Sequence, residues 1–139
     1  VAMLDFTEIE GKKISELVKE GKIKQEKLNE IVERTKKGGA EIVKYLEKGS
    51  AFYAPAASGV EMAECYLKNL KKQLPCAVYL NGEYGAKDIY AGVPVIIGSG
   101  GVEKIIELQL SEEEKANFEN SVKAVNELFS AAKKIDPSL

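Results

Sequence analysis

The sequence predicts an α+β domain built on an antiparallel sheet. Several long stretches repeat apolar residues at steps of three and four, which is typical of amphipathic helices, and three strand patterns follow one another between residues 76 and 108. The elements come in runs of one type instead of alternating, and this order favours an antiparallel sheet with helices packed on it. No repeat or linker interrupts the 139 residues, so residues 1–139 are expected to form a single domain.

For the amino-terminal third of the chain, the sequence predicts one extended segment and two helical stretches. Residues 1–9 are expected to be extended, and Ser15 is expected to cap a short helix that Gly21 ends. A long helix is predicted over residues 25–47, with Leu28, Ile31, Val32, Ile42, Val43 and Leu46 on its apolar face. Gly38 and Gly39 interrupt it. Two glycines cost about 1–2 kcal/mol in a helix relative to alanine, so they predict a kink or a close backbone approach.

A loop at residues 48–50 leads into the next predicted helix. Pro55 suits the first turn of that helix, where a missing backbone N–H costs nothing. The helix is expected to continue to about Lys72 and to turn inward a stripe made of Val60, Ala63, Leu67 and Leu70.

Three strands are then predicted, over residues 76–80, 91–97 and 102–108. Asn81-Gly82 is a turn signal between the first two strands. Residues 98–101, Gly-Ser-Gly-Gly, are expected to turn the second strand into the third.

The last predicted helix begins with a capping box formed by Ser111 and Glu114. Its expected buried stripe is Phe118, Val122, Val125, Phe129 and Ala132. Burial of the four large members would contribute roughly 1.5–3 kcal/mol each as an upper estimate, so this helix requires a partner surface.

Composition excludes several function classes. Twenty basic residues against 22 acidic ones leave a net charge of −2, which argues against nucleic acid or an anionic membrane surface as a partner. No apolar run approaches the roughly 20 residues that a membrane-spanning helix needs, and the acidic amino terminus does not resemble a secretory signal. Two cysteines, Cys65 and Cys76, are too few for a disulfide framework and favour a reducing compartment, with one bridge between them as the alternative.

The chain is poor in catalytic groups. It contains no histidine, so it lacks the commonest general acid–base and the commonest metal ligand. Glu61 and Glu64 are interpreted as a solvated helix face, and Glu112, Glu113 and Glu114 as helix-dipole partners rather than as paired catalytic carboxylates.

Two other motifs have simple structural explanations, and one residue stands apart. Residues 98–101 do not open a helix, as a phosphate-binding loop would. Cys76 without a histidine partner is interpreted as a small buried apolar residue, and Tyr53 stands out only because it enters a helix from a loop. No group of residues in the chain can carry out a reaction by itself.

Four blocks resemble one enzyme family, the malate dehydrogenases of the lactate-dehydrogenase-like kind. The first block is the loop-to-helix segment at residues 48–58, Lys-Gly-Ser-Ala-Phe-Tyr-Ala-Pro-Ala-Ala-Ser. The others, in the family's order, are residues 33–43, residues 80–85 together with 92–98, and residues 101–107. The resemblance covers nearly the whole chain and implies a twisted antiparallel sheet packed by a long broken helix and a carboxy-terminal helix.

The resemblance implies the substrate-side half of an NAD-dependent enzyme that interconverts malate and oxaloacetate. In the family the acid–base histidine, the substrate-binding arginines and the nucleotide loop precede this region, so the chain is expected to be an inactive fragment whose partner is its own amino-terminal Rossmann domain. Ser50 and Ala51 are expected to line the dicarboxylate pocket, and Pro55 to pack near the nicotinamide. A homodimer or tetramer, a cytoplasmic location and no metal are expected. The alternatives are a malate-derived lactate dehydrogenase and a non-catalytic oligomerisation module.

Overall fold

The protein is described here by a computed structural model that covers residues 3–138. The chain forms two compact units that divide after Tyr53. The first contains η1 (Leu4–Phe6), β1 (Glu8–Ile9), β2 (Lys12–Lys13), α1 (Ile14–Lys19), α2 (Gln25–Lys36) and α3 (Gly38–Leu46). Helix α4 (Tyr53–Leu67) begins at the boundary between the units. It is followed by β3 (Lys72–Asn81), η2 (Glu83–Gly85), β4 (Lys87–Gly98), β5 (Gly101–Ile105) and α5 (Glu112–Ile135).

The start of the chain differs from the extended segment that the sequence predicted. Residues 4–6 form a 3-10 turn, because the Thr7 hydroxyl donates to the Met3 carbonyl at 2.7 Å and the Thr7 N–H donates to the Leu4 carbonyl at 3.2 Å. Glu8 and Ile9 form the short strand β1, which pairs with Lys13 and Lys12. Val1 and Ala2 lie outside the described residues.

The cap predicted for the first helix is wrong, whereas its end is right. Lys13 precedes α1 without a side-chain cap, and Ser15 lies inside the helix. The helix starts two residues earlier than a serine cap would place it because the Ile14 N–H is already bonded to the Thr7 carbonyl, at 3.0 Å. Gly21, with φ of +72°, closes the segment as predicted.

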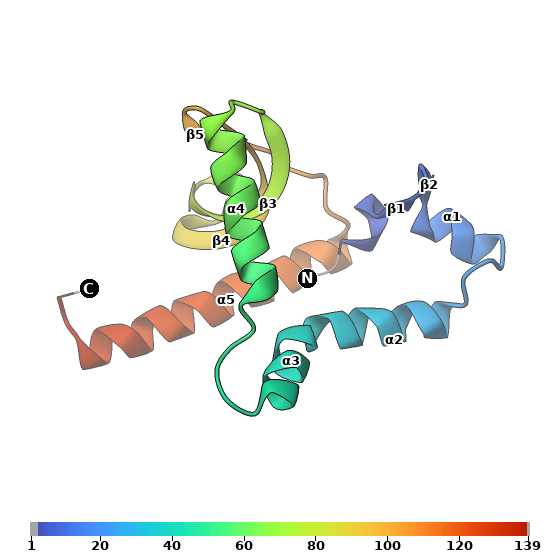
Figure 1. Cartoon of the computed structure of the whole chain (residues 1–139), viewed down its shortest axis with the longest axis horizontal. Coiled ribbons are helices and arrows are strands. Elements are labelled where there is room, and N and C mark those ends of the chain that lie inside the picture. The colour runs from blue at the N-terminus through green and yellow to red at the C-terminus, as the bar shows by residue number, and fades with distance from the viewer. Residues whose placement is uncertain (1–2, 139) are drawn as a thin grey trace. The chain divides into compact units, whose positions relative to one another are not determined.

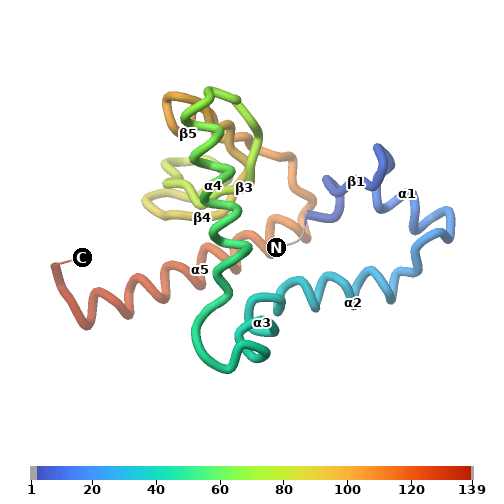
Figure 2. Tube along the Cα trace, in the orientation of Figure 1, coloured from blue at the N-terminus to red at the C-terminus, as the bar shows by residue number. Residues whose placement is uncertain are grey.

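The predicted break in the long helix is confirmed. The chain bends between α2 and α3, at Lys37 (Figure 2). A Cβ built on Gly38 or Gly39 would meet nothing within 4 Å, so the glycines permit the bend and no backbone approaches them closely. Arg34 spans the break with two hydrogen bonds to the Glu41 carboxylate, at 3.1 and 2.9 Å.

The sheet of the second unit is antiparallel with the order β3-β4-β5 (Figure 1). Alternate side chains of β3 and β4 point to one side, where Leu80 and Val95 are fully buried. Cys65 of α4 belongs to the same core, and Phe118 and Val122 of α5 pack against it. The predicted α+β class, with helices packed on an antiparallel sheet, is therefore confirmed. The two turns predicted at residues 81–82 and 98–101 both connect neighbouring strands.

The stripe predicted to face inward on α4 is wrong. Val60 and Leu67 are 68% and 79% exposed, and Leu70 lies beyond the end of the helix at Leu67. The side of α4 that meets the sheet carries Cys65 instead, which is fully buried. The most apolar face of this helix thus points away from the core of its own unit.

The stripe predicted for α5 is only partly correct. Phe118, Val122 and Ala132 are half-buried, whereas Val125 and Phe129 are exposed in the described chain. The capping box of Ser111 and Glu114 is present as predicted.

Candidate functional site

The loop that leaves α3 carries two of the predicted site residues. Ser50 and Ala51 follow a sharply bent stretch in which Glu47 and Gly49 have φ of +58° and +92°. Ser50 is exposed and Ala51 is half-buried. The loop therefore presents a small hydroxyl and a methyl group, which leave room beside them and add no charge.

Pro55 lies in the first turn of α4, as predicted, and its ring is exposed. The third position of a helix has no intrahelical acceptor for its N–H, so proline costs nothing there. Because Ser50 and Ala51 belong to the first unit and Pro55 to the second, the structure describes the three residues separately.

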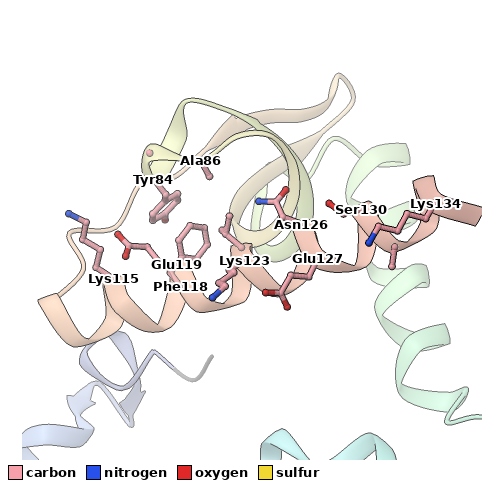
Figure 3. A pocket seen from close by; sticks show the side chains of 13 residues that line it. Tyr84, Ala86, Lys115, Phe118, Glu119, Lys123, Asn126, Glu127, Ser130 and Lys134 are labelled. Atoms are coloured by element: carbon pink, nitrogen blue, oxygen red, sulfur yellow. The ribbon is translucent and has the colours of Figure 1, made fainter. Parts of the chain in front are cut away.

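A groove that the sequence did not indicate runs along α5 beside the η2 turn (Figure 3). It encloses about 670 Å³. Its floor is apolar, formed by Tyr84, Phe118 and Val122, and its rim is charged. The lining residues are Tyr84, Gly85, Ala86, Lys115, Phe118, Glu119, Val122, Lys123, Asn126, Glu127, Ser130, Ala131 and Lys134.

Tyr84 fixes one end of this groove. Its hydroxyl donates to the Ile106 carbonyl at 2.6 Å and accepts from the Leu108 N–H at 2.9 Å, and its ring lies 5.2 Å from that of Phe118. Burial raises the pKa of this phenol, and both of its hydrogen-bonding functions are used. Tyr84 therefore joins the η2 turn to the segment before α5 and is unsuited to proton transfer. Its backbone is left-handed, with φ of +55°. This conformation was not predicted from the sequence, which indicated only a turn at Asn81-Gly82.

The carboxylates that the sequence assigned to solvated faces are paired with lysines. Glu61 binds Lys72, and Glu64 binds Lys68. The hydrogen bond and charge of Lys68 lower the pKa of Glu64, which keeps that carboxylate ionised. Of the acidic trio at the start of α5, Glu114 is buried within the capping box and Glu112 and Glu113 are exposed. These groups have structural roles.

Cys76 is half-buried rather than buried, and its pKa is raised, first by burial and then by the nearby Cys65 and Glu61. A raised pKa makes a poor nucleophile at neutral pH. Both cysteines are free thiols, in agreement with the predicted absence of a disulfide.

Two features are absent from residues 3–138: a metal site built from three His, Cys, Asp or Glu side chains, and a helix that could span a membrane. No three side chains of the types His, Cys, Asp and Glu come together there to hold a metal ion. None of the helices in this range is both long enough and apolar enough to cross a bilayer.

A dinucleotide would find limited contacts on this chain. The exposed ring of Pro55 offers an apolar surface that suits a nicotinamide face. The one glycine-rich stretch, residues 98–101, closes the β4–β5 hairpin and does not open a helix, so it does not form the usual pyrophosphate site.

The described residues thus form a three-stranded antiparallel meander between α4 and α5, with small residues in the loop before α4. Residues 1–135 match the family model of the lactate/malate dehydrogenase alpha/beta C-terminal domain. The chain therefore belongs to this family.

Within the family, similarity is high to malate dehydrogenases. The malate dehydrogenase of Pelagibacter ubique is 66% identical over 134 residues, which are 96% of this chain and 42% of that protein. The crystal structure of Cryptosporidium parvum malate dehydrogenase superposes with a TM-score of 0.92 at 43% identity and covers 95% of this chain and 42% of its own. A lactate dehydrogenase from Eimeria maxima, solved with NADH and oxamate, gives 0.92 at 41% identity, with 97% and 42% covered. The chain thus spans less than half the length of the relatives it matches.

Proposed function

We propose that this chain is the substrate-side domain of an NAD-dependent malate dehydrogenase. The observation that carries the proposal is the 66% identity, over nearly the whole chain, to a protein named malate dehydrogenase. The reaction is malate plus NAD⁺ giving oxaloacetate, NADH and a proton, and the bound dinucleotide supplies the hydride acceptor.

In this proposal the chain contributes shape and polarity to the reaction chamber. Ala51 forms part of the wall of the substrate pocket, where its methyl group leaves space for a second carboxylate, and the Ser50 hydroxyl offers a hydrogen bond beside it. Pro55 gives an apolar contact for the nicotinamide. Its exposed ring at the start of α4 and the absence of charge at residues 50 and 51 support these roles.

The acid–base pair and the groups that bind the substrate carboxylates belong, in this proposal, to an amino-terminal Rossmann domain. The chain has no histidine, and its single arginine, Arg34, is hydrogen-bonded to Glu41 at the helix break. The 139-residue chain alone is therefore expected to be inactive.

The test is a comparison of two proteins. The whole protein that carries this chain behind its nucleotide-binding half should oxidise NADH with oxaloacetate, and the 139-residue chain should not. A folded whole protein that shows no turnover with oxaloacetate would contradict the proposal, and so would turnover of malate with NAD⁺ by the chain alone.

A lactate dehydrogenase is the second candidate, because the Eimeria maxima enzyme superposes as well as the malate dehydrogenase from Cryptosporidium parvum. The same assay with pyruvate separates the two. Activity with pyruvate and none with oxaloacetate would establish the lactate function.

A non-catalytic assembly role is the third candidate. It is favoured by the exposed apolar side of α4, where Val60 and Leu67 face away from the core. A homodimer or tetramer of the whole enzyme would cover such a face without excluding catalysis, so this role and the dehydrogenase function can coexist.

A further inference from the structure

Three of the four sulfur-containing residues in this chain belong to α4 and β3. The chain has two cysteines and two methionines. Met62 and Cys65 come from α4 and Cys76 comes from β3, within one compact unit, whereas Met3 belongs to the other unit.

One sulfur–sulfur contact joins the helix to the strand, and burial and helix position place the third sulfur-containing residue. The Cys76 thiol donates to the Met62 thioether sulfur at 3.5 Å. Met62 and Cys65 are three residues apart on the helix and therefore share a face. Cys65 is fully buried in the core against which Cys76 packs, and Met62 is 39% exposed. The cluster thus has a buried thiol at its base and a thioether at its opening.

We propose that Met62, Cys65 and Cys76 form a binding site for one soft monovalent cation, Cu(I) or its redox-inert analogue Ag(I). Thiolate and thioether sulfurs are the ligands that such cations select. With metal–sulfur bonds of about 2.3 Å, as for thiolates on zinc, a three-coordinate centre holds its sulfurs about 4 Å apart. The Cys76–Met62 separation of 3.5 Å needs to open by roughly half an ångström, which the flexible methionine side chain permits.

Other cations fit the cluster poorly. Structural zinc takes four nitrogen, thiolate or carboxylate ligands, and this site offers two thiols and a thioether. Hard cations need oxygen ligands, but the neighbouring Glu61 carboxylate is paired with Lys72. The chemistry of the donors therefore selects a soft cation.

Binding displaces the two thiol protons. One M⁺ and two neutral thiols give a complex of charge −1 with two thiolates and one thioether, and two protons are released to solvent. Because protons compete with the cation for the thiol sulfurs, the affinity should increase with rising pH.

The experiment titrates the full 139-residue chain with Ag(I), and with Cu(I) against a competing chelator, and follows stoichiometry by native mass spectrometry. One ion per chain is expected, with no Zn(II) adduct under the same conditions. Met62→Leu keeps the side-chain volume and should weaken binding by on the order of tenfold, because one of three soft ligands is lost. Cys65→Ala and Cys76→Ala should weaken it more, and Met3→Leu is the matched control that should leave it unchanged.

Circular dichroism of each variant separates loss of the site from loss of the fold. If the cysteine variants do not fold, Met62→Leu against Met3→Leu still decides the question. Equal affinity in these two variants would overturn the proposal, and so would equal affinity of the native and urea-unfolded chain, since free thiols would then explain the binding without an assembled site.

Discussion

At the scale of single residues, the loop before α4 carries Ala51, the side chain to which we assign a role in substrate choice. Ala51 is half-buried and contributes only a methyl group. In the proposed enzyme it stands at the pocket wall, where typical lactate enzymes of the resembled family carry threonine. An added hydroxyl and methyl would take up space that a dicarboxylate needs.

Ala51→Thr in the whole protein should therefore lower kcat/KM for oxaloacetate by about tenfold or more, a typical effect of one added group in a fitted pocket. Steady-state kinetics with oxaloacetate and pyruvate would measure the effect. Ala40→Thr is the control, because Ala40 is exposed on α3 and should leave both rates unchanged. Equal kcat/KM for oxaloacetate in the wild type and in Ala51→Thr would show that Ala51 does not line the pocket.

Gly98 is a residue whose small size is required by its neighbours. A Cβ at this position would lie 2.4 Å from Oε1 of Glu103 and 2.9 Å from Oδ1 of Asn69. Both atoms hold the β4–β5 turn: Asn69 accepts from the Ser99 N–H at 3.0 Å and Glu103 accepts from the Gly100 N–H at 3.3 Å. Neither side chain can withdraw without losing its bond.

We expect Gly98→Ala to lower the free energy of unfolding by about 1–3 kcal/mol, the cost of disrupting one or two hydrogen bonds. Urea unfolding of the chain would measure it. Gly92→Ala in the same strand has free space around its Cβ and should change stability by less than about 0.5 kcal/mol. Equal stability of the two variants would show that the turn adapts freely.

At the scale of secondary-structure elements, the break between α2 and α3 is held by one ion pair. The two hydrogen bonds from Arg34, followed by its charge, lower the pKa of Glu41. A lowered carboxyl pKa means that the pair stabilises the folded chain above the unfolded pKa, and that this contribution disappears as the pH falls through the folded pKa.

Arg34→Gln should therefore raise the pKa of Glu41 toward its ordinary value of 4.5. Carboxyl carbon NMR during an acid titration would measure the change. Lys27→Gln breaks an ion pair elsewhere on α2, with Glu30, and should leave Glu41 unaffected. An unchanged Glu41 titration in Arg34→Gln would show that the pair does not form in solution.

The start of α5 depends on a second local device. The Ser111 hydroxyl accepts from the Glu114 N–H at 3.4 Å, and the Glu114 carboxylate accepts from the Ser111 N–H at 3.1 Å. The cap fixes where the helix begins and therefore which of its residues, Phe118 and Val122, meet the sheet.

Ser111→Ala should destabilise the chain by about 1 kcal/mol, the usual effect of losing a helix cap. The midpoint of urea unfolding would report it. Ser121→Ala, an exposed serine in the middle of the same helix that donates only to the Asn117 carbonyl, should change stability little. A larger loss for Ser121→Ala than for Ser111→Ala would contradict the role of the cap.

At the scale of the whole molecule, α4 exposes large apolar side chains to solvent. Val60 and Leu67 are largely open to solvent, and Leu128 of α5 is as well. Exposed apolar patches of this kind normally mark an interface with another domain or subunit.

The 139-residue chain is accordingly expected to associate as its concentration rises, which analytical ultracentrifugation would detect. Val60→Glu with Leu67→Glu should abolish association if α4 forms the contact, and Leu128→Glu should leave it intact. A wild-type chain that stays monomeric at all concentrations would refute this expectation. If Leu128→Glu alone abolishes association, the contact is formed by α5 and not by α4.

The sequence predicted local features reliably where short-range interactions decide them. The break at Gly38-Gly39, the turns at residues 81–82 and 98–101 and the capping box at Ser111 all depend on neighbours in the chain, and all are confirmed. The serine cap of α1 failed because a hydrogen bond from Ile14 to Thr7, across the first hairpin, determines that helix start.

The sequence by itself thus determined the class of fold, the order of the α-helices and of the strands of the three-stranded sheet, and, through resemblance, the family. Which face of each helix is covered was decided by tertiary structure. The α4 stripe of Val60 and Leu67 has the period of a core face, but the sheet packs on the side of Cys65. An apolar period indicates that a helix face favours burial, but it does not indicate which surface will cover that face. The reason is that the hydrophobic effect is non-directional. The sulfur cluster and the groove at Tyr84 likewise depend on contacts between α4 or α5 and residues distant in the chain, and these contacts exist only once the sheet has formed.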